Sequence, residues 1–174
     1  MKKLLSAFAV LLAMSGAQAS AQDVANMSDL EYAHIAYTAD NIDIRYAHLA
    51  LALSKNAAVH DFARTMIRDH EAVNEAALAL LGKLGVEAKD NFLSKSLNAN
   101  AENVLADLAG RRGADFDRAY AANELAYHKA VNDLVENTFI PNIDNAEVKA
   151  LFEQGLAIFK AHERHAEVMV ENLR

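Results

Sequence analysis

Histidines stand at positions where a helical pattern calls for an apolar side chain. In residues 56–86, positions spaced by three and four form an apolar stripe in which His70 is the one titratable side chain. His162 interrupts a similar stripe near the C-terminus, and His128 lies one helical turn after Glu124. Neutral imidazole is a common ligand of zinc, copper and iron. The pattern therefore suggests a metal site, whereas an isolated buried histidine is usually a hydrogen-bonded core residue.

Carboxylates occupy matching positions on other stripes. Asp43 has alanines four and seven residues away on both sides, which leaves room for an ion or a partner side chain. The alternative is an aspartate at the solvent boundary. Glu124 and His128 share a helix face, so they either bind one metal ion jointly or form a hydrogen bond without a metal. His165, three residues after His162, is either a further ligand or a residue at the solvent edge.

Long helices must position these residues. The stripes and caps predict long helices over about residues 29–54, 56–86, 115–138 and 144–174, with a short helix over about residues 99–109 between the second and the third. One proline, six glycines and few aromatic residues favour helices over a sheet. If neighbouring helices are antiparallel, the polar residues of the stripes all lie near the middle of the bundle along its long axis. We therefore expect an all-α protein, an antiparallel four-helix bundle.

The N-terminus has the features of a secretory signal. Two lysines precede an apolar run that ends at Met14, and small residues follow it. We expect cleavage after Ala19 or Ala21, so that residues 1–21 are a signal peptide and residues 22–28 a disordered lead-in. The apolar run is shorter than the ~20 residues that span a bilayer, which argues against the alternative of an uncleaved anchor. The mature protein is thus expected in the periplasm without a membrane span.

Charge and cysteine content narrow the classes of function. The chain has 17 Lys+Arg against 24 Asp+Glu, and its basic residues are scattered, which disfavours nucleic acid as a partner. The absence of cysteine excludes disulfides, lipoprotein attachment and covalent haem. No phosphate loop or zinc-protease motif is present, so we expect no nucleotide cofactor. Non-covalent haem bound through Met66 or Met169 is the weakest alternative, and we expect no haem.

Several stretches resemble a known bacterial family. Residues 41–86, 116–135 and 150–173 are similar to the bacterial domain of unknown function 4142, a set of exported proteins with a ferritin-like helical bundle. The resemblance covers about Asp29 to Leu173. It implies a ferritin-like fold, a periplasmic address and a suspected metal site, but it implies no reaction.

Individual residues carry this resemblance. The family's Asp-His pair matches Asp69 and His70, and its later inward histidine matches His128. Its final histidine, followed four residues on by alanine, matches His162. Asp43 stands where many members have glutamate, which is a conservative departure.

Together these observations predict a metal-binding protein of the periplasm for storage, buffering or stress protection. The metal is expected to be zinc, copper or iron. The sequence is compatible with a homo-oligomer. The alternative is a non-enzymatic envelope-stress or interaction protein whose polar network only fixes helix register. A ferroxidase is less well supported, because the Glu-x-x-His spacing of di-iron proteins occurs only in Glu31 with His34, near a helix start. The predicted metal ligands are Asp43, His70, Glu124, His128 and His162.

Overall fold

The computed structural model describes residues 21–174, and within them it contains helices and no strand. The all-α prediction is therefore confirmed. No helix in the described part of the chain is both long and apolar enough to cross a membrane. The predicted signal peptide, apart from Ala21, lies outside the described residues. The helices are α2 (Ala21–Ala25), α3 (Asp29–Leu53), α4 (Ala57–Leu84), α5 (Phe92–Ala109), α6 (Gly113–Leu134), the π-helical turn η1 (Val135–Phe139), α7 (Ile140–Asn142) and α8 (Ala146–Asn172).

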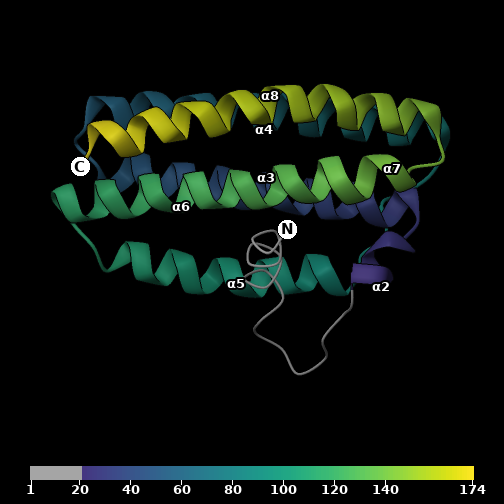
Figure 1. Cartoon of the computed structure of the whole chain (residues 1–174), viewed down its shortest axis with the longest axis horizontal. Helices are drawn as coiled ribbons and strands as arrows, with labels where there is room; N and C mark the ends of the chain where they lie inside the picture. The colour runs from purple at the N-terminus through teal and green to yellow at the C-terminus, as the bar shows by residue number, and fades with distance from the viewer. Residues whose placement is uncertain (1–20) are drawn as a thin grey trace, which may run out of the picture.

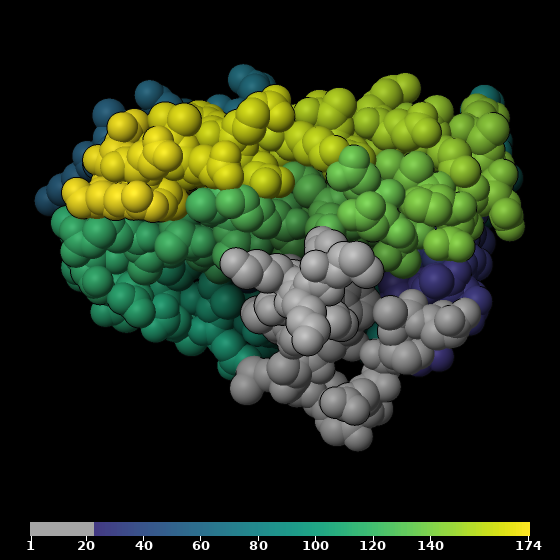
Figure 2. All heavy atoms as spheres, in the orientation of Figure 1, coloured from purple at the N-terminus to yellow at the C-terminus, as the bar shows by residue number. Residues whose placement is uncertain are grey.

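Long helices pack around a common interior, and we call α3, α4, α6 and α8 the helix ring. In this ring α3 contacts α4, α4 contacts α8, α8 contacts α6, and α6 contacts α3. The chain reverses direction between α3 and α4 and again between α6 and α8, whereas α5 lies outside the ring against α3 (Figure 1). Figure 2 shows α6 and α8 side by side along one face of the molecule. Residues facing inward from the ring therefore meet in one shared core.

Side-chain caps fix where three of the ring helices, α3, α4 and α8, begin. Ser28 and Glu31 form a capping box at the start of α3, in which each side chain accepts a hydrogen bond from the backbone of the other. Asn56 caps α4, and that helix is followed by Gly85, whose φ of 68° is the left-handed conformation typical of this position. The last helix begins slightly later than predicted, because Asn145 provides its cap.

The helix between the second and third long helices is longer than predicted. Its cap is Asn91, whose side chain accepts hydrogen bonds from the backbone of Leu93 and Ser94. Leu97 and Leu108 are buried and join the core. The polar residues between these positions interrupt the apolar pattern, so the sequence predicted only the second half of α5.

The segment predicted as a disordered lead-in contains a helix. Val24 of α2 is fully buried, and its carbonyl accepts a hydrogen bond of 2.8 Å from the hydroxyl of Tyr32. The ring of Tyr32 also packs against Phe139, with 4.6 Å between the ring centroids. These contacts explain why α2 is helical rather than disordered.

Candidate metal centre

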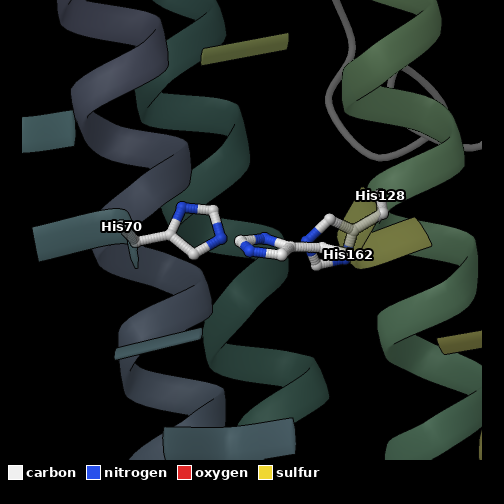
Figure 3. Close-up of side chains that lie close together, drawn as sticks. All are labelled: His70, His128 and His162. Carbon is white, nitrogen blue, oxygen red and sulfur yellow. The ribbon is translucent and has the colours of Figure 1, made fainter. Parts of the chain in front are cut away.

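The structure brings all five predicted ligands together inside the helix ring. Each of them is at most 3% exposed. Ligand atoms of the three histidines lie within 4.8 Å of one another, and so do ligand atoms of the two carboxylates and His128. Figure 3 shows the three imidazole rings converging from α4, α6 and α8. We call this set the buried cluster, and its members are Asp43, His70, Glu124, His128 and His162.

Each histidine of the buried cluster is anchored through one ring nitrogen. In all three cases the partner is a carboxylate or carbonyl oxygen, which accepts a hydrogen bond, so the anchored nitrogen carries a hydrogen. This fixes the orientation of each ring and directs the other nitrogen into the cluster. The anchoring pairs are His70 Nδ1 with Asp40 Oδ1 at 2.8 Å, His128 Nδ1 with the Glu124 carbonyl at 2.9 Å, and His162 Nε2 with Asp69 Oδ2 at 2.9 Å.

The inward-facing atoms have no hydrogen-bond partner within residues 21–174. These atoms are the second nitrogen of each histidine and all four carboxylate oxygens of Asp43 and Glu124. His70 Nε2 and His128 Nε2 lie 3.0 and 3.3 Å from Asp43 Oδ2, which are ion-pair distances without the alignment of a hydrogen bond. Buried polar atoms in folded proteins are nearly always partnered. A converging set of such atoms has the chemistry of a cation site.

Burial and mutual proximity set the protonation of the carboxylates. Burial alone would raise the pKa of Asp43, but the charges of His70 and then His128 outweigh it and lower the pKa to about 2. Burial raises the pKa of Glu124 well above its ordinary value, and the negative charge of Asp43 raises it further. One carboxylate is therefore ionised at neutral pH, and the other tends to hold a proton.

The histidines of the buried cluster also differ in their protonation at neutral pH. Burial acts to lower the pKa of His70, but the carboxylates of Asp43 and Asp40 outweigh it and raise the pKa to about 10. Burial lowers the pKa of His128, and it lowers that of His162 to about 4. At neutral pH the protein without metal thus has a protonated His70 and two neutral imidazoles.

Metal binding is expected to release protons from the buried cluster. At neutral pH a cation must displace the proton of His70, whose pKa is about 10, and that of Glu124, whose pKa is raised. Affinity should therefore rise with pH and fall as the pH drops, by about tenfold per pH unit for each proton displaced. Zinc calorimetry in buffers of different ionisation enthalpy counts these protons. A zinc affinity that is the same at about pH 6 and about pH 8 would contradict this expectation.

Other residues considered from the sequence lie outside the buried cluster. His165 is exposed, and its ring packs against Phe62 with 5.0 Å between the centroids. Glu31 caps α3, and His34 lies beside Asp90, with its Nδ1 3.8 Å from Asp90 Oδ1. The two methionines considered as haem ligands, Met66 and Met169, are buried in the hydrophobic core.

Two anchoring carboxylates were missed as functional residues. Asp40 lies one turn before Asp43 on α3, and this spacing was a usable signal. Asp69 was noticed only as a match to the family, yet its carboxylate holds His162 of another helix. Hydrogen bonds, first from Arg68 and also from His162, lower the pKa of Asp69 and keep it ionised.

Comparison with known proteins adds a family but no characterised relative. A family model described as "Domain of unknown function (DUF4142)" matches residues 13–169, a range that includes the whole buried cluster and its anchoring carboxylates. No curated protein and no solved structure matches the chain. The interpretation of the cluster therefore depends on its own geometry.

Proposed function

The chain belongs to the family described as a domain of unknown function (DUF4142), and from its buried cluster we propose that it binds one transition-metal ion. The cluster supplies three imidazole nitrogens and two carboxylates. In metalloproteins a ligating histidine almost always donates its other N–H to a carboxylate, a carbonyl or water, as these three do. The observation that carries the proposal is that every inward-facing atom is a buried donor or acceptor without a hydrogen-bond partner among the described residues.

The structural alternative fits this geometry less well. A network that only fixed helix register would pair its polar atoms with one another. Instead, His128 Nδ1 donates to the carbonyl of Glu124, and the Glu124 carboxyl group, 3.8 Å from that nitrogen, has no hydrogen-bond partner in residues 21–174. The neutral ring of His128 then directs a lone pair at Asp43 from 3.3 Å. Two acceptors at this distance repel each other unless a cation lies between them.

The donor set favours zinc, copper or iron, since imidazole suits all three. We propose a ferritin-like arrangement for the helix ring, in which α5 is the crossover between the pairs α3/α4 and α6/α8. The cluster lies in the core of this ring, as metal sites of such proteins do. With one group of ligands rather than two Glu-x-x-His motifs, the geometry supports storage, buffering or stress protection better than a di-iron oxidase.

We propose that the protein is exported to the periplasm, which the N-terminal sequence supports. Mass spectrometry of the protein recovered from the periplasm should show a mature chain that begins at Ser20 or Gln22. A periplasmic chain that still carries Lys2 would show that the signal is not removed.

Elemental analysis of the periplasmic protein tests the metal proposal. We expect about one equivalent of a transition metal per chain in the parent and almost none in the double variant His70→Ala, His162→Ala. The matched control is His60→Ala, His165→Ala, which removes histidines of the same two helices that lie outside the buried cluster. Equal metal contents in the parent and both double variants would overturn the proposal.

A further inference from the structure

The ligand atoms of the buried cluster form two groups of three, and His128 belongs to both. In the first group, which we call the histidine group, its partners are His70 and His162. In the second, the carboxylate group, its partners are Asp43 and Glu124. Within each group the ligand atoms lie within 4.8 Å of one another. The buried cluster therefore contains two places at which three ligand atoms converge.

His128 can serve an ion in only one of these groups at a time. Its Nδ1 donates to the carbonyl of Glu124 at 2.9 Å, which leaves Nε2 as the ring nitrogen for a metal. A neutral imidazole has one nitrogen lone pair, and here it lies on Nε2. An ion that takes this lone pair in one group therefore leaves the other group with two ligands.

Asp43 lies close enough to the histidine group to serve an ion there as well. Its Oδ2 is 3.0 Å from His70 Nε2 and 3.3 Å from His128 Nε2. Two ligands of one ion, each about 2.1 Å from it, lie about 3–3.5 Å apart, so these distances suit a shared ion. The two groups thus overlap at Asp43 and His128. They differ in Glu124, which belongs only to the carboxylate group, and in His162, which belongs only to the histidine group.

We propose that the buried cluster offers its one ion two overlapping positions, a histidine position that takes zinc or copper and a carboxylate position that takes a harder divalent cation such as manganese. This inference rests on the proposed function, because it divides the same metal site. Imidazole suits zinc and copper, whereas carboxylate oxygens suit manganese. The carboxyl oxygens of Asp43 and Glu124 have no hydrogen-bond partner among residues 21–174, so they are available to a cation. In the zinc form Glu124 lies beside the ion and acts on it through its charge.

Two single variants separate the two positions. Manganese is titrated into the chelator-treated protein and free Mn²⁺ is measured by electron paramagnetic resonance, and the zinc affinity is measured by competition with a coloured chelator. We expect Glu124→Gln to weaken manganese by about tenfold or more and zinc much less, and His162→Ala to do the reverse. The control His165→Ala, on the same helix as His162 but outside the buried cluster, should change neither affinity.

The ratio of the manganese Kd to the zinc Kd is the decisive quantity, because a general loosening of the core weakens both metals together. The ratio should rise in Glu124→Gln and fall in His162→Ala, and zinc should displace manganese from the parent one for one. If His162→Ala does not fold by circular dichroism, His162→Gln takes its place.

Three results would overturn the division into two positions and leave the proposed function standing. They are a ratio that does not move in opposite directions in the two variants, a parent that holds zinc and manganese at once, and a parent that binds zinc but not manganese. A parent that binds neither zinc, copper nor manganese would overturn the proposed function as well.

Discussion

Zinc is expected to raise the melting temperature of the parent protein by about 5–10 °C and to leave that of the double variant His70→Ala, His162→Ala almost unchanged. Binding to the folded state alone stabilises it by about 2.7 kcal/mol at a hundredfold excess of free metal over Kd. In a domain of this size each kcal/mol raises the melting temperature by about 2–4 °C. Differential scanning calorimetry of chelator-treated protein, with and without zinc, measures the shift within each variant.

The shift is compared within each variant because removing a buried histidine also changes the stability without metal. The control double variant His60→Ala, His165→Ala should show the same zinc-induced rise in melting temperature as the parent, since neither histidine belongs to the buried cluster. Copper and iron are titrated in the same way, because the donor set does not select among the three metals. If no metal raises the melting temperature of the parent, or if both double variants respond equally, the cluster is a structural network.

Glu124→Leu is expected to make the metal-free protein more stable while weakening its response to zinc. Glu124 is fully buried, burial raises its pKa well above the ordinary value, and neither carboxyl oxygen has a hydrogen-bond partner among the described residues. A buried polar group without a partner costs about 1–3 kcal/mol, and leucine removes this cost at similar volume. We therefore expect the free energy of unfolding without metal to rise by about 1–3 kcal/mol.

Urea denaturation with and without zinc measures both effects. Glu124→Gln is the matched control, since it keeps a buried polar group and should stay close to the parent in metal-free stability. If Glu124 had a structural role, the free energy of unfolding without metal should instead fall, because leucine cannot replace the contacts of a residue that holds the polar network together. A metal-free Glu124→Leu protein that is less stable than the parent would therefore favour the structural alternative.

Helical periodicity was sufficient to find the inward-facing residues. Asp43, His70 and His162 each interrupt an apolar stripe, and a stripe buried against neighbouring helices must face the common core. Helix lengths and short connections predicted that these residues lie at the same level along the long axis of the bundle, and the structure brings them close together. The members of the buried cluster could therefore be identified without knowing the crossing angles of the helices.

Partners and irregular elements could not be identified in this way. Asp69 follows Arg68 and precedes His70 in sequence, but only the approach of α8 decides that its carboxylate holds His162. The third long helix was predicted to continue to about residue 138, whereas it ends at Leu134 and is followed by the π-helical turn η1. A π-helix occurs mostly as a single turn inside an α-helix, so helical periodicity does not show where one begins.

Anomalous diffraction from crystals grown with zinc, collected on both sides of the zinc absorption edge, shows directly whether the buried cluster binds a metal ion. We expect one strong peak inside the helix ring, about 2.0–2.2 Å from His70 Nε2, His128 Nε2, His162 Nδ1 and a carboxylate oxygen of Asp43. A peak only at surface residues such as His34 or His165, with none inside the buried cluster, would contradict it.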